Sequence, residues 1–399
     1  MKARDTDPEG SESGSVKGRE KLQNLLLVVV AVLSSGVLLE VGWLLYGLFA
    51  PPPTPWPPGI TLTLETLPGV TPGIRGPSVF SVSSLGVRSR EPAKDDRFRV
   101  LCTGGSTTEC AFLDDSEAWP SLLEQHLGGI SQGVWVGNAG LSGMSLSGQV
   151  QRLDDWLDGW PPMDLLVVLS GVNDLAWRLQ QGDEYLPRKP PSLWQRSALG
   201  TLWSRLTGLG TAPADLGHGL KSQLPPPGQS LAIPAANRIY LRWRQRRAQA
   251  SATISRLPDL KRALEEYEAA LHATIDTASR RSMKVCFLTQ PTLWKEDMPP
   301  EEEKLLWFGW AGSRDEETGP YYSAGTLAQG MKQYNDVLRA VCRRRNAPCI
   351  DLAARLPKNT SVFYDDCHFN EEGARQVARL VAEGLKEKAR IKKDLRSKD

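Results

Sequence analysis

Short, mostly apolar runs alternate with amphipathic stretches along most of the chain. Five apolar runs are continuous enough to be strands buried on both faces, namely 99–103, 134–138, 164–169, 284–289 and 348–352. Several of them are separated by stretches with apolar residues at helical spacing, at 116–127, 260–281, 326–345 and 371–388, the first of which begins with the capping residue Ser116. This alternation predicts a doubly wound, flavodoxin-like α/β/α sandwich around a five-stranded parallel sheet, with its site at the carboxyl ends of the strands.

A different pattern precedes this domain. Residues 22–50 are uncharged except for Glu40, and a helix needs only about 20 apolar residues to cross a membrane. The first basic residue after the stretch is Arg75, whereas several precede it, namely Lys2, Arg4, Lys17, Arg19 and Lys21. This asymmetry predicts a single-pass transmembrane helix with a cytoplasmic N-terminus and with the α/β domain on the periplasmic, extracellular or lumenal side.

A cleaved signal peptide is the alternative interpretation of the same stretch. The stretch is too long for one, and a cut after Ala50 would place Leu48 where a small residue is needed. We therefore expect an uncleaved anchor. Glu40 is unusual in such a span, and we expect it either near the outer interface or facing a partner helix.

Composition divides the remainder of the chain. We expect a disordered tail over 1–21, a stiff Pro-rich linker over 51–79, the α/β domain over 80–388 and a basic tail over 389–399. The net charge of +2 favours neither nucleic acid nor an acidic partner. With four histidines and no Cys-x-x-Cys pair, the sequence predicts no metal site and no cofactor.

A long insertion, 182–258, separates the third and fourth predicted strands. Part of it, 193–209, forms an apolar helical stripe of Trp194, Ala198, Leu202 and Leu206. The insertion is either a lid or a membrane-lying element, or it is a small satellite core with solvated arginines, namely Arg238, Arg242, Arg244, Arg246 and Arg247.

Four segments carry candidate chemistry, three of them directly after predicted strands. In 102–109, a Gly-Gly turn exposes Ser106 at the start of a helix, where backbone amides can stabilise an oxyanion. Residues 138–143 contain Gly140 and Gly143, which suit close backbone approach but also an ordinary turn. In 170–174, Asn173 is either an amide donor or a helix cap.

The fourth segment, 364–373, supplies a general base. His368 has a side chain that titrates near neutrality, and Asp365, three residues earlier, can hold its other ring nitrogen. The remaining histidines, at 126, 218 and 272, are expected to be surface residues.

Taken together and in this order, the four segments resemble the four sequence blocks of the SGNH (GDSL) hydrolase superfamily. The resemblance implies that Ser106 is the nucleophile and that His368 and Asp365 are the base and its orienting carboxylate. It also implies an oxyanion hole formed by the Ser106 amide, Gly143 and Asn173, with Gly140 as a second candidate for the glycine.

The sequence departs from the family pattern in the first block. Gly105 stands where the family has Asp, which removes a hydrogen-bonding group but no catalytic atom. Asp366 lies beside Asp365 and could compete for the imidazole, although the spacing favours Asp365. The run 80–88 also resembles the segment before the first block in membrane-anchored members.

The function implied is a membrane-anchored serine esterase that cleaves acylated lipid or polysaccharide through an acyl-enzyme on Ser106. The alternatives are an O-acyltransferase with the same acyl-enzyme and a non-catalytic scaffold protein of the same fold. Two disulfides are conceivable, Cys110–Cys367 between the catalytic loops and Cys342–Cys349 across a turn.

Overall fold

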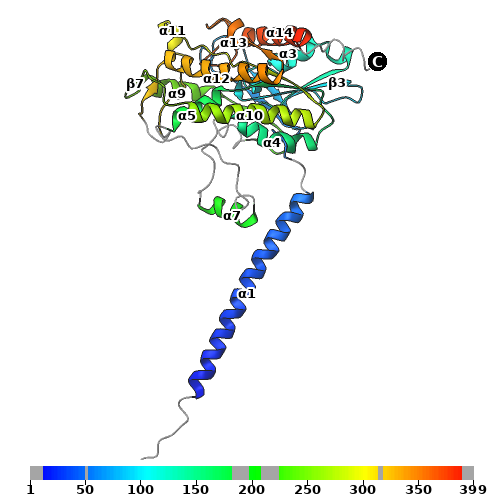
Figure 1. Ribbon diagram of the computed structural model, residues 1–399, viewed down its shortest axis with the longest axis vertical. Coiled ribbons are helices and arrows are strands. Elements are labelled where there is room, and N and C mark those ends of the chain that lie inside the picture. Colours follow the sequence, from blue (N-terminus) through cyan, green and yellow to red (C-terminus); the bar gives the residue numbers. More distant parts are fainter. Residues whose placement is uncertain (1–11, 50–52, 182–196, 208–223, 313–317, 389–399) are drawn as a thin grey trace, which may run out of the picture. The chain divides into compact units, whose positions relative to one another are not determined.

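The computed structural model describes residues 12–49, 53–181, 197–207, 224–312 and 318–388 (Figure 1). The chain divides into two compact units. One unit comprises residues 1–51 and 189–213, and the other comprises residues 52–188 and 214–399. The expected tail 389–399, most of the expected tail 1–21, and the candidate residues Trp194 and His218 lie outside the described residues.

The larger unit is built on a five-stranded sheet whose strands are all parallel and lie in the order β10-β8-β5-β3-β4. Its strands are β3 (Phe98–Gly104), β4 (Val134–Asn138), β5 (Leu165–Leu169), β8 (Lys284–Leu288) and β10 (Cys349–Ile350). Nearly every residue of β3, β4 and β5 is buried, as expected for strands covered on both faces. The expected five-stranded parallel sheet is confirmed.

Helices cover both faces of this sheet. On one face α3 (Trp119–His126) packs against α14 (Glu371–Lys388), and on the other α10 (Lys261–Arg280) packs against α4 (Leu146–Asp158) and α12 (Ala324–Arg345). In Figure 1, α3 and α14 lie along the upper side of this unit and α4 and α10 along its lower side. The other helices in the described part of this unit are α2 (Ser106–Glu109), the 3-10 turn η1 (Gly129–Gln132), α5 (Val172–Gln180), α9 (Arg238–Ala248), α11 (Pro300–Glu303) and α13 (Leu352–Arg355).

Two element boundaries differ from the sequence-based expectation for local reasons. The helix expected from Ser116 begins at Trp119, because Ser116 donates through both its amide and its hydroxyl to Asp114 Oδ1 and forms a turn instead. The last strand starts at Cys349 because Pro348 has no N–H to donate to the neighbouring strand.

A small second sheet has the order β2-β1-β6 and consists of β1 (Thr61–Leu64), β2 (Ser78–Ser81) and β6 (Ser230–Ile233). A two-residue pairing, β7 (Thr253–Ile254) with β9 (Tyr321–Tyr322), lies apart from it. β1 falls in the segment expected to be a linker, and β6 comes from the insertion. The buried indole of Trp56 precedes β1, and its Nε1 donates to Gly140 O at 3.3 Å. This segment therefore contributes ordered structure to the domain.

The smaller unit contains α1 (Glu12–Phe49) and α7 (Ala198–Thr207). The helix α1 begins ten residues before the apolar stretch. Its part Lys21–Tyr46 has a mean hydropathy of 2.4 and is long and apolar enough to cross a membrane. A signal sequence near an N-terminus passes the same test of hydropathy, so this property alone fits either an anchor or a signal sequence.

Candidate active site

The parallel sheet brings three of the four chemical segments to one edge, and the loop before α14 supplies the fourth. Ser106 follows β3 and is the first residue of α2, while Asn173 follows β5 near the start of α5. Ser106 Oγ lies 2.7 Å from His368 Nε2, although the two residues are 262 positions apart. His368 Nδ1 in turn lies 2.7 Å from Asp365 Oδ2. The structure therefore brings the expected hydroxyl, imidazole and carboxylate into one hydrogen-bonded chain.

Asp365 is completely buried, and donors surround its carboxylate. The backbone amides of Cys367 and His368 donate to Oδ1 at 3.0 and 2.9 Å, and Trp307 Nε1 donates to Oδ2 at 2.9 Å. A buried carboxylate is stable as an anion only when such donors compensate for the lost water. The loop 365–368, together with Trp307, thus stabilises the charged form of the Asp365 carboxylate.

The pKa values of Asp365 and His368 are both shifted in the direction that favours the charged form. Burial alone would raise the pKa of Asp365, but the nearby His368 and the donors to the carboxylate outweigh this effect and lower it. Burial would likewise lower the pKa of His368, and the charge and hydrogen bond of Asp365 reverse this and raise it. The imidazolium that forms when His368 accepts a proton is therefore stabilised.

Asp366 has a different role from its neighbour. Trp294 Nε1, Trp307 N and Phe308 N donate to its carboxylate at 2.7, 2.8 and 3.3 Å. Burial, followed by the charge of Asp365, raises the pKa of Asp366 to about 6. Asp366 anchors the loop that carries Trp307, and Asp365 is the carboxylate that contacts the imidazole.

Aromatic rings surround the imidazole of His368. Tyr364 stacks on it with centroids 5.5 Å apart, and Trp307 lies nearly parallel to it at 6.3 Å. Tyr240, which comes from α9 in the insertion, meets it edge-on at 6.2 Å. Tyr240 and Trp307 could not be identified as site residues from the sequence, because neither belongs to a recognisable motif. These rings fix the orientation of the imidazole and exclude water from its sides.

Two arginines of α9 bind backbone carbonyls around the loop that carries His368. Arg244 donates to three of them, those of Val70, Leu305 and Tyr364. Arg247 donates to those of Phe308 and Tyr322, and burial lowers its pKa. The interpretation of these two side chains as solvated was therefore wrong. The helix α9 packs onto residues 364–370, the loop that carries His368, which we call the base loop.

Of the residues expected to form an oxyanion hole, Asn173 lies against Gly105, the residue before Ser106, and Gly143 has the backbone conformation that favours glycine. Gly143 has a φ of +78°, and Asn173 is buried with its Nδ2 3.0 Å from Met144 O, which leaves one of the two amide hydrogens for another acceptor. A Cβ atom at Gly105 would lie 2.2 Å from Asn173 Nδ2. The glycine in place of the family aspartate thus lets the Asn173 amide approach residues 104–110, the turn that carries Ser106, which we call the nucleophile turn.

Gly140, the second candidate for the oxyanion glycine, has a different role. Its amide donates to Asn138 Oδ1 at 2.9 Å, and a Cβ atom there would lie 2.2 Å from Glu109 N. The neighbouring Ser142 amide donates to the Glu109 carboxylate. The loop that carries Gly143 is therefore attached directly to the turn that carries Ser106.

The nucleophile turn ends abruptly, and side chains satisfy its carbonyl groups. The helix α2 has one turn, and Cys110 after it adopts the left-handed conformation with a φ of 53°. Trp119 Nε1 donates to Thr107 O at 3.0 Å, and Asn138 Nδ2 donates to Thr108 O at 2.8 Å. Carbonyls at a helix end have no partner within the helix, so such donors decide whether the turn is rigid.

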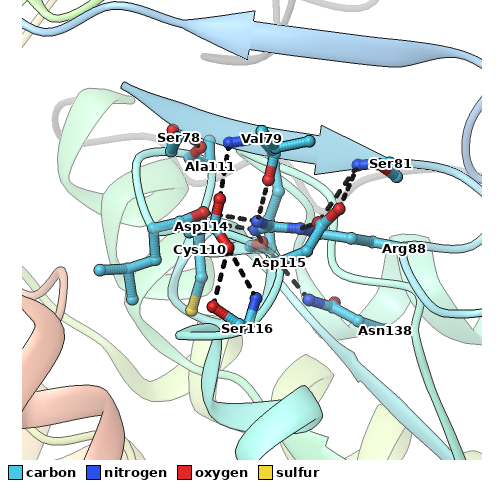
Figure 2. Close-up of polar contacts among 12 residues, drawn as sticks. Ser78, Val79, Ser81, Arg88, Cys110, Ala111, Asp114, Asp115, Ser116 and Asn138 are labelled. Carbon is cyan, nitrogen blue, oxygen red and sulfur yellow. Dashed lines mark hydrogen bonds and ion pairs between the residues drawn. The ribbon is translucent and has the colours of Figure 1, made fainter. Parts of the chain in front are cut away.

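Arg88 provides most of the remaining donors, as Figure 2 shows. Its guanidinium is almost completely buried and pairs with Asp115 at 2.7 Å. It donates to four carbonyls, those of Val79, Glu109, Cys110 and Leu113. Its backbone also exchanges two hydrogen bonds with Asn138. Arg88 thus ties the segment before β3 to the carbonyls that follow Ser106.

Cys110 and Cys367 lie on the two catalytic loops but form no disulfide, so the proposed bridge was wrong. Both thiols are buried. Burial raises the pKa of Cys110 to about 12 and that of Cys367 well above its usual value. These thiols therefore remain protonated and poorly reactive.

Asp365, Cys367 and His368 place potential metal-ligating atoms within 4.8 Å of one another. Both ring nitrogens of His368 are already bonded within the chain that reaches Ser106, and Cys367 would have to ionise against its raised pKa. This donor set therefore suits proton transfer better than metal ligation. As expected, His126 and His272 lie on helices α3 and α10, away from these residues.

A parallel α/β sandwich with a serine, a histidine and a carboxylate at the carboxyl edge of its sheet defines the class of serine hydrolases. Residues 102–376 match the model of the GDSL-like Lipase/Acylhydrolase family. Since the match covers more than half of the chain, the protein belongs to this family and is a serine hydrolase of ester bonds. The expected family is confirmed.

No curated protein sequence matches the chain. Three similar solved structures are the acetylxylan esterase Axe2 from Geobacillus stearothermophilus (13% identity, 72% of this chain and 94% of that chain, TM-score 0.39), the acetyl xylan esterase AlAXEase (15%, 72% and 100%, 0.38) and a lipolytic G-D-S-L family protein from Desulfitobacterium hafniense (12%, 72% and 99%, 0.37). At these TM-scores the likenesses add nothing to the family assignment, which rests on the sequence match.

Proposed function

We propose that the protein hydrolyses carboxylic esters through an acyl-enzyme on Ser106. The observation that supports this most directly is the 2.7 Å contact between Ser106 Oγ and His368 Nε2, in line with the buried Asp365. This arrangement lets the imidazole remove the serine proton as the oxygen attacks a carbonyl carbon.

The mechanism has two steps that use the same groups. In the first, Ser106 attacks the ester carbonyl, His368 accepts its proton, and the proton then passes to the departing alcohol. The Ser106 and Gly143 amides and the Asn173 side chain stabilise the negative oxygen of the tetrahedral intermediate. In the second, water attacks the acyl-serine with His368 again as base, which releases the acid and restores Ser106.

We further propose that α1 is an uncleaved membrane anchor and that the domain works outside the cytoplasm. The side chains of the apolar stretch between Lys21 and Tyr46 are almost all exposed, which suits a lipid surround. The basic residues before the stretch and their absence from residues 22–74 set its orientation. Protease digestion of sealed vesicles would test this topology, because a domain that is digested from the cytoplasmic side would contradict it.

The nucleophile is tested by labelling the full chain with a fluorophosphonate probe. We expect the wild type to be labelled and Ser106→Ala to be unlabelled, with a fall in ester turnover of about 10⁶-fold, since the nucleophile and base act as a unit. Ser142→Ala is a suitable control, because Ser142 lies on a neighbouring loop and takes part in the contacts described above only through its backbone amide, which the substitution keeps. Activity that persists in Ser106→Ala would contradict the proposal.

The fate of the acyl group is a separate question. Release of acetate from a p-nitrophenyl ester, compared with transfer to an added glycan, distinguishes hydrolysis from O-acyl transfer. Predominant transfer would replace water by a sugar hydroxyl in the second step but leave Ser106 in its role. A chain that is neither labelled nor active would instead support a scaffold function.

A further inference from the structure

The apolar stretch of α1 is covered at only two of its positions. Among residues 21–46, all described in the structure, only Gly36 and Glu40 are half-buried and every other residue is exposed. These two residues are one helical turn apart and therefore share a face of the helix. The element that covers them is α7, from the insertion in the catalytic domain.

The contact between the two helices includes two charge-assisted hydrogen bonds. The amides of Ala198 and Leu199, at the start of α7, donate to the two carboxylate oxygens of Glu40, both at 2.9 Å. Leu199 Cδ1 lies 3.9 Å from the position that a Cβ atom of Gly36 would occupy. The first turn of α7 thus lies directly on the only charged residue of the stretch.

This contact explains how a carboxylate is tolerated in an apolar helix. A charged group in a bilayer is costly unless it has a partner. The start of a helix carries unsatisfied amides and a partial positive charge, which together favour an anion. Glu40 and the start of α7 therefore satisfy each other, and α7 must lie at the depth of Glu40.

The next turn of α7 exposes large apolar side chains. Leu202 and Trp203 are 49% and 55% exposed, and they follow Leu199 at helical spacing. On α1, Trp43 and Tyr46 stack at 5.9 Å within two turns of Glu40. Trp and Tyr are enriched at the boundary between lipid and water, so these aromatic residues indicate that Glu40 and α7 lie near that boundary.

We propose that α7 is a second membrane-binding element, which lies in the lipid interface beside α1 with Leu202 and Trp203 inserted between lipids. The occupant of this apolar face is the lipid bilayer, since the face is continuous with the proposed span of α1. This inference rests on the proposed membrane anchor. It assigns part of the insertion to the membrane rather than to a lid or a satellite core.

The test uses the full chain in liposomes, with an environment-sensitive NBD fluorophore on single introduced cysteines. Trp203→Cys reports on α7, and Leu33→Cys, within the apolar stretch, reports on the anchor. Ile130→Cys is the matched control, because Ile130 is an equally exposed apolar residue, at 69%, of the catalytic domain. We expect doxyl-labelled lipids to quench the probes at 203 and 33 several-fold more than the probe at 130.

Each outcome has a distinct meaning. Quenching at 33 but not at 203 overturns the inference and leaves the anchor intact, whereas no quenching at 33 overturns the anchor itself. A probe at 203 with blue-shifted emission but no quenching shows that protein covers this face instead of lipid, which also overturns the inference.

The role of Glu40 is tested in the same system. Glu40→Leu removes both acceptors, so we expect quenching at 203 to fall several-fold while quenching at 33 is unchanged. Unchanged quenching at 203 would contradict a role for Glu40 in seating α7. As a second readout, Gly36→Cys with Leu199→Cys should form a disulfide on mild oxidation, and failure to form it would contradict the contact between the helices.

Discussion

The nucleophile turn and the base loop meet at one hydrogen bond, but they are stabilised in different ways. After Ser106, the buried guanidinium of Arg88 donates to the carbonyls of Glu109, Cys110 and Leu113. The side chain of Asn138 donates to that of Thr108. Around His368, three aromatic rings hold the imidazole, and several separate groups donate hydrogen bonds to Asp365. The first arrangement therefore depends mainly on one residue, Arg88, whereas the second should tolerate the loss of any one neighbour outside the triad.

After Ser106→Ala, the largest effect is expected within the base loop, from Asp365→Asn. The amide cannot stabilise the imidazolium and favours the wrong tautomer of His368, so kcat should fall about 10³- to 10⁴-fold. Asp366→Asn is the matched control, because Asp366 does not contact the imidazole. Steady-state ester hydrolysis measures both variants, and an equal loss in both would contradict the separate roles of the two carboxylates.

Next in size is Arg88→Lys, which tests whether one residue dominates the nucleophile turn. Lysine keeps a charge beside Asp115 but cannot reach all four carbonyls, so Ser106 should lose its alignment with the oxyanion donors. A misplacement of about 1 Å can cost about 100-fold, and we expect a loss of this order in kcat with little change in KM. The rate of fluorophosphonate labelling gives a second measure.

The control for this variant is Arg90→Lys. Arg90 pairs with Asp96 and Glu124 and does not contact the nucleophile turn. Equal losses for the two substitutions would show that Arg88 has no special link to Ser106. Thermal unfolding of both variants separates a loss of alignment from a loss of folded protein.

A smaller effect is expected from Trp307→Phe, which removes one donor from Asp365 and keeps an aromatic ring beside His368. A hydrogen bond to a charged group contributes about 1.5–3 kcal/mol, and the remaining donors should limit the fall in kcat to about tenfold. Trp294→Phe removes the equivalent bond from Asp366 and should have less effect. A loss as large as that of Asp365→Asn would show that the base loop also depends on one neighbour.

The smallest effect is a shift in pH dependence. His368 must be neutral to accept the serine proton, and its pKa is raised above the usual value of 6.5, chiefly because Asp365 outweighs the effect of burial. Activity should therefore be lost as pH falls through a midpoint above 6.5. A pH profile of kcat/KM for the wild type measures this midpoint, and a value at or below 6.5 would contradict the stabilised imidazolium.

Much of the sheet and the four site segments could be predicted from sequence because they depend on local patterns. A buried parallel strand is apolar throughout, and a turn with small residues follows it where a ligand must approach. Gly105 could also be noticed as a departure. The consequence of Gly105 could not be predicted, because the Asn173 amide that occupies the space beside Gly105 comes from the loop after another strand.

The supports of the site could not be predicted, because they act across long separations and through irregular loops. Trp307 reaches Asp365 across 58 positions from a loop without periodicity. Tyr240 and Arg244 lie in a helix whose many arginines suggest a solvated surface, and only the folded chain shows which of them face inward. The role of Arg88 likewise depends on the left-handed turn at Cys110, for which a non-glycine residue gives little signal.

The pairing of β1 with β6 bears on how a soluble version of the protein can be prepared. β1 is the central strand of its sheet, bonded to β2 on one side and to β6 on the other. Cutting the chain at residue 80, where the sequence led us to expect the start of the domain, would leave β6 with an open edge and remove Trp56 from Gly140. Unpaired strand edges promote aggregation, so a truncated protein without the anchor should retain residues 53–79 to remain monodisperse.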